Sequence, residues 1–248
     1  MKVLSHNSLK GKRNYNHDIL SIKDKFCYVM DGATPLFNDN IFYETSDLYE
    51  YMHLLKNNIE DISSIEHNII EGIKKSNKHL KEYEKYEEYA LPNFTIAAIK
   101  ENEDTYESYL LCDSLISILY KDGKIENIED NRFDSIKNQT IEEIKKINKL
   151  NLTAEEILEH KKEIWRKYRK LANKGYPVGT TNYESINKGI IKTIEKEKID
   201  KILICTDGFY NELGKPSNNS YFEKDTIEKK ISNIKNNDDL TYILIDNI

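Results

Sequence analysis

Short apolar runs joined by hairpin-type turns are the sequence feature that most constrains the fold of this chain. The runs Ile19–Ile22 and Phe26–Met30 are separated by a polar Lys-Asp-Lys turn, and Lys121–Lys124 carries the Asp-Gly pair of a tight hairpin. Strands come first, followed by helices, more strands, a helical insertion, strands, a helix and a last strand. Because hairpins pair strands antiparallel, this order favours an α+β protein with antiparallel sheets over alternating βαβ units.

Further strands are predicted where apolar runs end in turn residues. They are Val3–Leu4, Phe94–Ile99, Tyr109–Tyr120, Ile125–Ile128, Ile190–Ile194, Lys201–Cys205 and Leu240–Ile245. Tyr109–Tyr120 is the longest of them, although Asp113 interrupts its middle. We expect Ile190–Ile194 and Lys201–Cys205 to form a strand pair.

Helical spacing governs two long stretches. Between residues 43 and 89, apolar side chains recur every three or four positions without a proline, and the pattern divides into two helices near Asp61. Residues 139–174 are helical again, with Thr153 as a helix N-cap and Glu156 three residues later.

The second helical stretch ends at Gly175–Gly179. Trp165, Tyr168 and Leu171 recur at helical spacing, so we expect them to dock this inserted helix while its lysines and arginines face solvent. A last helix is expected from Asp225 to Lys235.

Composition narrows the class of protein. The 248 residues suffice for one domain with a conventional core, and 37 basic against 43 acidic residues, without a long basic block, argue against a nucleic acid partner. Cys27, Cys112 and Cys205 lie inside apolar runs without CxxC spacing, which predicts buried, unpaired thiols in a reducing cytoplasm. With no signal-peptide pattern and no run of about 18 apolar residues, we expect a soluble cytoplasmic protein without a membrane partner.

Aspartates placed at the ends of apolar runs are the candidate functional residues. Asp31 and Asp207 each end such a run and are followed by a glycine, and Asp238 and Asp239 stand just before the last run. A carboxylate at the end of a buried strand is held rigidly, and a following glycine lets the backbone fold closely around a ligand. Because divalent magnesium, manganese and calcium prefer oxygen ligands, three such strand ends indicate a shared metal centre.

Taken in chain order, these motifs and three others resemble those of the metal-dependent protein phosphatases of the 2C type, the PPM family. The resemblance spans nearly the whole chain, and its order and spacing are more specific than any single Asp-Gly pair. The matching segments are Gly11–Asp18, Tyr28–Gly32, Phe94-Thr95, Leu111–Ser114, Cys205–Gly208 and Asp238–Thr241.

The resemblance implies a fold, an activity and a cofactor. The fold would be a four-layer αββα sandwich, in which two antiparallel β-sheets are flanked by helices. Residues 1–248 would form a single phosphatase 2C-like domain, with a helical flap at about 130–180 beside the active site. The activity would be hydrolysis of phosphoserine and phosphothreonine on proteins by a water that two Mn²⁺ or Mg²⁺ ions activate. We expect a monomer whose partners are phosphorylated proteins, within a serine/threonine kinase system.

Site residues also follow from the resemblance. Metal ligation is implied for Asp18, Asp31, Gly32, Asp113, Asp207 and Asp238, and catalytic roles for Arg13 and Asp18. Asp31 would bridge two ions, to which the Gly32 carbonyl would add a ligand, whereas Asp113 would serve a third, weaker ion. Arg13 would present its fork of donors to the substrate phosphate.

The chain departs from the family pattern at several positions. His17 stands where the family usually has glutamate, and it is a candidate general acid or base, or alternatively a hydrogen-bonding residue. Ala33 follows the Asp31-Gly32 pair, Cys112 replaces a glycine and Asp239 replaces an asparagine. The changes near Asp113 weaken the third-ion assignment most.

Two other functions remain open at the level of sequence. A haloacid dehalogenase-type phosphatase would need a nucleophilic aspartate two residues before an Asp-Gly pair, but Val29 and Cys205 occupy those positions, and the βαβ pattern is missing. A catalytically silent phosphatase-like module that binds phosphoproteins or a regulatory partner is the second alternative.

Overall fold

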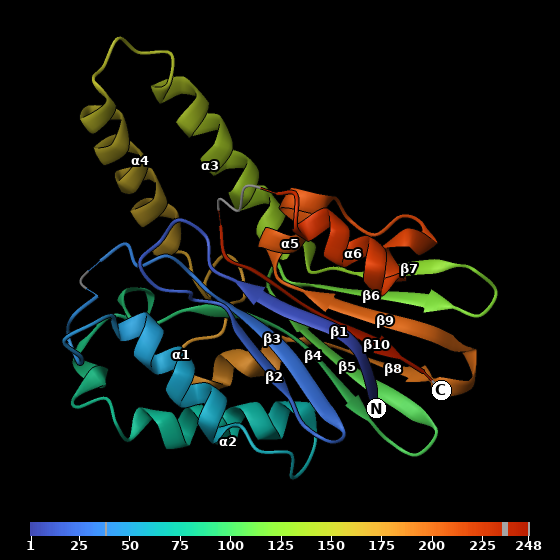
Figure 1. The fold of residues 1–248 in the computed structure, drawn as a ribbon. Coiled ribbons are helices and arrows are strands. Elements are labelled where there is room, and N and C mark those ends of the chain that lie inside the picture. The colour runs from blue at the N-terminus through green and yellow to red at the C-terminus, as the bar shows by residue number, and fades with distance from the viewer. Residues whose placement is uncertain (38, 235–237, 248) are drawn as a thin grey trace.

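The computed structural model describes residues 1–37, 39–234 and 238–247, and its strands form two antiparallel five-stranded sheets (Figure 1). The first sheet has the strand order β1-β10-β9-β6-β7, and the second has the order β2-β3-β4-β5-β8. The strands are β1 Lys2–Leu9, β2 Ile19–Ile22, β3 Phe26–Gly32, β4 Phe94–Glu101, β5 Thr105–Leu111, β6 Leu115–Tyr120, β7 Ile125–Ile128, β8 Ile190–Glu195, β9 Ile199–Cys205 and β10 Leu240–Asp246.

Helices cover the outer faces of both sheets. The α-helices are α1 Asp47–Asn58, α2 Ile65–Asn77, α3 Asp134–Ile147, α4 Ala154–Arg169, α5 Asp207–Leu213 and α6 Lys224–Ile231. The helices α1 and α2 pack on the second sheet, and α5 and α6 pack on the first. The predicted α+β sandwich with layers αββα is therefore confirmed.

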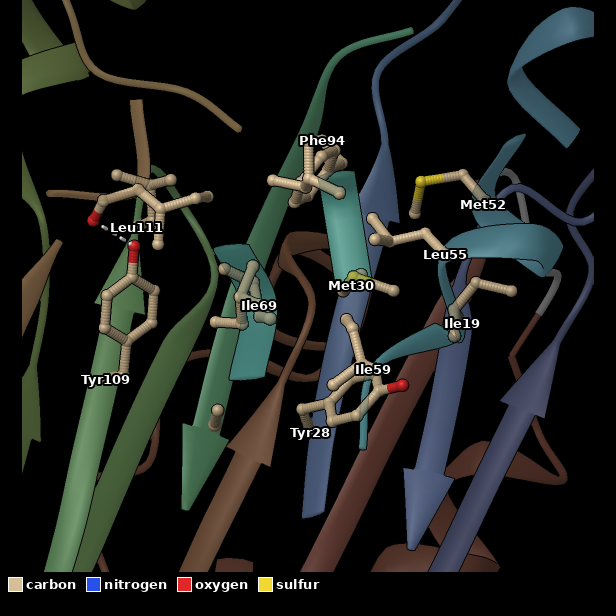
Figure 2. Packing of buried hydrophobic residues seen from close by; sticks show 14 of the residues in the cluster. Ile19, Tyr28, Met30, Met52, Leu55, Ile59, Ile69, Phe94, Tyr109 and Leu111 are labelled. Carbon is tan, nitrogen blue, oxygen red and sulfur yellow. Dashed lines mark hydrogen bonds between the residues drawn. The ribbon is translucent and has the colours of Figure 1, made fainter. Parts of the chain in front are cut away.

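Three layers of apolar side chains hold the sandwich together, because both faces of each sheet are covered. Val29 on β3 points into the core between the sheets, whereas its neighbour Met30 points to the outer core beneath α1 and α2. Figure 2 shows Met30 and Phe94 facing Leu55 of α1. Burial on both faces explains why these strands read as continuous apolar runs rather than as an alternating pattern.

The run Tyr109–Tyr120 forms two strands, so the prediction of one long strand was wrong. The chain leaves β5 at Leu111 and enters β6 at Leu115, which takes it from the second sheet to the first. Cys112 has a φ of 65°, a left-handed conformation that non-glycine residues seldom adopt, and it ends the strand. Asp113 was the one sign of this turn in the sequence, and the buried apolar residues on both sides of it made the run resemble a single strand.

The predicted pairing of the two strands after residue 189 was also wrong. Strand β8 pairs with β5, whereas β9 lies between β10 and β6 in the other sheet. One turn of 3₁₀ helix, Lys196–Lys198, takes the chain from one sheet to the other. Helix α5 was not anticipated. Lys235, the predicted end of the last helix, lies outside the described residues, and α6 ends at Ile231.

The helices α3 and α4 form a hairpin that projects from the sandwich (Figure 1). The predicted capping box is present at the start of α4, where Thr153 and Glu156 exchange hydrogen bonds. Tyr168 docks this helix as expected, but Leu171 is 39% exposed and lies beyond the helix end. No helix of the described residues is long and apolar enough to cross a membrane.

Candidate active site

A cleft lies where strand ends of the two sheets meet the base of the α3–α4 hairpin. Its volume is about 540 Å³. The hairpin and the loops beside it supply the apolar and aromatic lining, which consists of Phe133, Ile136, Trp165, Tyr168, Tyr176 and Val178. The charged residues that line the cleft are Arg13, Asp31, Asp113, Lys137, Arg169, Asp207 and Asp238.

Four acids reach this cleft from separate places in the chain. Asp31 is the penultimate residue of β3, and Asp207 begins α5 directly after β9. Asp113 lies in the crossing from β5 to β6, and Asp238 stands two residues before β10. The structure thus brings together carboxylates that are up to 207 positions apart in the sequence, because the strand ends of two packed sheets meet here.

The acids are short of positive charge. Burial raises the pKa of Asp31 well above its usual range, and the charges of Asp18, Asp113 and Asp238 raise it further. Burial likewise raises the pKa of Asp207, with additional repulsion from Asp113 and Asp31. A cation bound among these carboxylates would relieve both effects.

The donor set fits a hard divalent cation in its chemistry, since it consists of carboxylates and the nearby Gly32 carbonyl. Its present orientation does not enclose an ion: within residues 1–37, 39–234 and 238–247, no three His, Cys, Asp or Glu side chains are arranged to hold one. Protein donors hold the carboxylates instead. Asn211 donates to Asp207 at 3.0 Å, and Arg13 pairs with Asp238. A metal ion would have to compete with these partners or bind through the carboxylate oxygens that they leave free.

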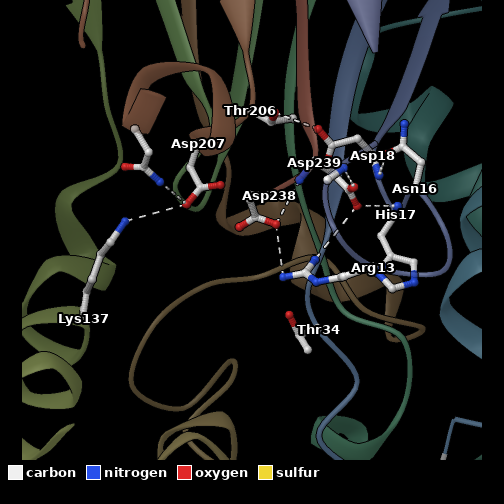
Figure 3. Close-up of polar contacts among 12 residues, drawn as sticks. Arg13, Asn16, His17, Asp18, Thr34, Lys137, Thr206, Asp207, Asp238 and Asp239 are labelled. Atoms are coloured by element: carbon white, nitrogen blue, oxygen red, sulfur yellow. Dashed lines mark hydrogen bonds and ion pairs between the residues drawn. The ribbon is translucent and has the colours of Figure 1, made fainter. Parts of the chain in front are cut away.

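Arg13 lies at the edge of the acid cluster. Its guanidinium is 3.1 Å from Oδ1 of Asp238 and 4.0 Å from Oδ2 of Asp239, as Figure 3 shows. The side chain is 32% exposed, so one side of the fork remains open to the cleft. An arginine held by carboxylates and facing a cleft is well suited to bind a second, external anion.

Asp239 has a structural role that its sequence position did not suggest. Its buried carboxylate accepts hydrogen bonds from the backbone N–H groups of Gly11 and His17, each at 2.8 Å. These bonds tie both ends of the loop that carries Arg13 to the start of β10. Asp239 therefore fixes the distance between the arginine and the acid cluster.

Two glycines press against the same stretch of backbone. A Cβ on Gly208 would lie 1.9 Å from the carbonyl oxygen of Asp239, and one on Gly11 would lie 2.5 Å from the carbonyl carbon of Asp238. Both positions therefore require glycine for close approach. Gly208 in this way allows α5 to contact the chain at Asp239.

Asp18 lies behind the cleft and does not line it. Its Oδ2 accepts a hydrogen bond from Oγ1 of Thr206 at 2.8 Å (Figure 3), whereas its Oδ1 is buried without a donor among the described residues. Burial raises the pKa of Asp18 to about 7, and Asp31 is among its neighbours. A buried acceptor without a donor beside Asp31 is the kind of group that an ordered water in a metal centre would satisfy.

His17 is buried next to Asp18 and also lies outside the cleft lining. Both ring nitrogens lack a hydrogen-bond partner in the described part of the chain, and burial lowers the pKa of the imidazole. Its carbonyl oxygen accepts from the N–H of Gly32 at 3.2 Å. A Cβ on Gly32 would lie 2.9 Å from that oxygen, so this glycine also permits a close approach.

Lys137 and Arg169 are the site residues that sequence reasoning missed. Lys137 of α3 lies beside Asp113 and Asp207. Arg169 was expected to face solvent, but it lines the cleft and donates to the carbonyl oxygen of Thr34 at 3.3 Å. Arg169 stands four residues after Trp165, so both share one helix face, and that spacing was the available signal.

Comparison with known proteins connects the fold to one family. The protein phosphatase 2C profile matches residues 48–238. The solved structure of the serine/threonine phosphatase Stp1 from Staphylococcus aureus is 15% identical, with a TM-score of 0.59 over 99% of this chain and 95% of that one. The Mycobacterium tuberculosis phosphatase PstP/Ppp is 13% identical, with a TM-score of 0.60 over 98% and 97%.

A further structure, the catalytic domain of PstP in complex with two manganese ions, is 14% identical, with a TM-score of 0.56 over 98% of this chain and 96% of that one. At these identities the likeness concerns the fold. No curated protein sequence matches the chain. The profile match covers most of the chain and agrees with the fold, so the chain belongs to the protein phosphatase 2C family.

Proposed function

We propose that this protein is a metal-dependent phosphatase that hydrolyses phosphoserine and phosphothreonine on proteins. The observation that carries the proposal is the convergence of four acids from both sheets on one cleft, with Arg13 at its edge. Phosphate monoesters hydrolyse extremely slowly in water, so a catalyst must both neutralise phosphoryl oxygens and provide a nucleophile. When bound, two Mn²⁺ or Mg²⁺ ions supply both effects.

The residues of the chain have separate roles in this proposal. Asp31, with the Gly32 carbonyl, would hold the ions from the second sheet, and Asp207 and Asp238 would hold them from the first. Asp18 would accept a hydrogen bond from water beside Asp31. Arg13 would bind the phosphate of the substrate and orient it.

His17 is proposed to take part in proton transfer in its neutral form. Its lowered pKa leaves the imidazole unprotonated at pH 7, so it would accept a proton before donating one. If so, the kcat of the wild-type protein falls as the pH is lowered, with an apparent pKa below about 6.5. This decrease at acid pH disappears from the pH–rate profile of His17→Gln. An unchanged acid limb would limit His17 to its backbone contacts with Asp239 and Gly32.

The setting of the enzyme is proposed from the same observations. Three buried, unpaired cysteines support a reducing compartment such as the cytoplasm. The apolar wall of Trp165 and Tyr168 beside the acids is suited to the side chains that flank a phosphorylated residue. The proposed substrate is therefore a protein that a serine/threonine kinase has phosphorylated.

A catalytically silent binding module is the second candidate, and one observation favours it. The carboxylates of Asp238 and Asp207 are paired with the protein's own cations, Arg13 and Lys137. With these two carboxylates paired, the cleft would bind a phosphoprotein through its arginine without requiring a metal ion.

Phosphate release with added Mn²⁺ separates the two candidates. Wild-type protein is expected to hydrolyse p-nitrophenyl phosphate and a phosphothreonine peptide, and Asp31→Asn and Asp238→Asn each to lose about a hundredfold or more of kcat. Asp122→Asn, on the exposed β6–β7 turn, is the control. Wild-type protein that binds the peptide without any Mn²⁺-dependent turnover would establish the binding module instead.

A further inference from the structure

The ammonium group of Lys137 lies between two of the four acids. Its Nζ is 3.6 Å from Oδ2 of Asp113 and 3.9 Å from Oδ2 of Asp207. The two carboxylates belong to different crossings of the chain, whereas the lysine comes from α3 in the projecting hairpin. Figure 3 shows Lys137 reaching Asp207 from the hairpin side of the cleft.

This position is the one that a cation would take if Asp113 and Asp207 ligated it together. An ammonium group supplies one positive charge and three donors, and its four-carbon stem fixes it to the helix. A divalent ion in the same place would meet that charge at a distance of a few ångströms, where the repulsion is strong in a partly buried site. The side chain of Lys137 is 36% exposed, so the ion pair is neither buried nor fully screened.

The two carboxylate oxygens of Asp207 have different surroundings. Oδ2 faces Lys137 and accepts a hydrogen bond from Asn211 at 3.0 Å. The other oxygen is directed to the side on which Asp238 lies (Figure 3). Asp207 can therefore face the lysine with one oxygen and a metal ion near Asp238 with the other.

We propose that Lys137 is a tethered cation that takes the place of a divalent ion between Asp113 and Asp207. The metal centre of this chain is consequently limited to the ions that Asp31, Asp207 and Asp238 hold, and Asp113 serves the lysine. The same ion pair anchors α3 over the cleft. This inference rests on the proposed metal-dependent function. It is tested by the difference in the number of bound ions between wild type and variants of Lys137.

The experiment is a Mn²⁺ titration of the purified protein in which free Mn²⁺ is measured by electron paramagnetic resonance. Wild-type protein is expected to bind two ions. Lys137→Gln, which keeps a polar side chain one atom shorter than lysine and removes its charge, is expected to bind one additional ion, with an affinity at least tenfold higher than any such binding in wild type. Lys137→Arg keeps a positive charge at this position and should bind the same number of ions as wild type.

Two further variants show where the additional ion binds. Asp113→Asn is expected to leave the count unchanged in the wild-type background and to abolish the additional ion in the Lys137→Gln background. Lys145→Gln, on the same helix with its ammonium paired to Glu142, is the matched control and should behave as wild type. Thermal unfolding of each variant verifies that it is folded.

The outcomes distinguish this inference from the proposed function. Equal ion counts in wild type and Lys137→Gln, or a count that falls by one in Asp113→Asn alone, would overturn the role of Lys137. No Mn²⁺ bound to wild type but one ion bound to Lys137→Gln would support that role while overturning the two-ion phosphatase. Two ions in wild type and three in Lys137→Gln would support both.

Discussion

At the scale of single residues, the geometry of the acid cluster depends on backbone contacts that leave no room for a Cβ. Gly208 lies against the carbonyl oxygen of Asp239, and the carboxylate of Asp239 in turn holds the N–H groups of Gly11 and His17. A displacement at Gly208 would therefore be passed on to the loop that carries Arg13. The position of the arginine is coupled to α5 through one acidic residue.

Replacing Gly208 with alanine tests this coupling. With the added Cβ placed 1.9 Å from the oxygen of Asp239, the chain must shift, which costs about 1–3 kcal/mol of unfolding free energy and about a hundredfold in kcat. Thermal unfolding and Mn²⁺-dependent phosphate release measure the two effects. The control is Gly123→Ala, since Gly123 has a φ of 85° in open space on the β6–β7 turn. That variant should lose about 1 kcal/mol and no activity, and equal activity in both variants would contradict the coupling.

Site residues differ in how far the sequence reveals them. Asp31 and Asp207 could be recognised because each ends a buried run before a glycine, which is a local pattern. Lys137 could not, because one lysine among many on α3 has no local mark, and its direction depends on how the hairpin docks. Asp239 was visible as an acid before the last strand and as a departure from the family pattern, but its two backbone partners are more than 200 positions away.

At the scale of secondary-structure elements, the α3–α4 hairpin is the part of the fold that is least covered by others. Each helix packs on the other, and contacts with the cleft are made at the base by residues such as Ile136 and Tyr168. The helical periodicity and the cap at Thr153 were predictable because both are local properties of the chain. The separation of β5 from β6 was not, since it depends on the left-handed conformation of Cys112.

Two helix caps are expected to respond differently to the same substitution. Thr153 accepts from the N–H of Glu156 at 3.3 Å in the projecting hairpin, and Ser46 accepts from the N–H of Tyr49 at 3.2 Å where α1 covers the second sheet. Loss of either cap costs about 1 kcal/mol, which corresponds to about fivefold faster amide hydrogen exchange in the affected unit.

In Thr153→Ala we expect that acceleration only in peptides from residues 134–169, with the melting temperature unchanged. In Ser46→Ala, which serves as the comparison, the melting temperature should fall by about 2–4 °C. Hydrogen exchange followed by mass spectrometry and calorimetry measure these responses. A hairpin that unfolds together with the sandwich would give the same result for both variants.

At the scale of the whole molecule, both sheets contribute acids to one cluster, so the charge of the cluster affects global stability. The pKa of Asp18 is about 7, far above that of an exposed aspartate, and the pKa values of Asp31 and Asp207 are also raised. Between about pH 4 and pH 7 the folded protein therefore holds protons that the unfolded chain releases. This stabilising contribution is complete at about pH 4 and is lost as the pH rises through 7.

Metal-free protein is consequently expected to melt at a lower temperature at pH 8 than at pH 5. Each fully coupled acid contributes at most about 1.4 kcal/mol per pH unit over this range. Mn²⁺ at pH 8 should restore the loss, because it binds only the folded protein. Calorimetry in EDTA and in Mn²⁺ gives both values.

The melting temperature of metal-free Asp18→Asn should decrease less between pH 5 and pH 8 than that of wild type, whereas the decrease in Asp122→Asn should match wild type. A melting temperature that is constant or rises over this range in EDTA would rule out the linkage.

The layered fold itself was predictable from the order of elements, since both sheets follow from hairpins and family motifs. The sheet to which β8 and β9 each belong was not, because a short connection is compatible with a hairpin and with a crossing alike.

The crossings between the sheets also determine which parts of the molecule are free to move. The chain passes from one sheet to the other at residues 10–18, 112–114, 129–189 and 196–198, and the first three of these connections carry Arg13, Asp113 and Lys137. With only three residues between β5 and β6, the sheets cannot slide apart at the cleft without breaking strand pairing. If the substrate is a protein, as proposed, the α3–α4 hairpin is the part of the cleft wall that could tilt to admit it, with the sandwich as the rigid frame.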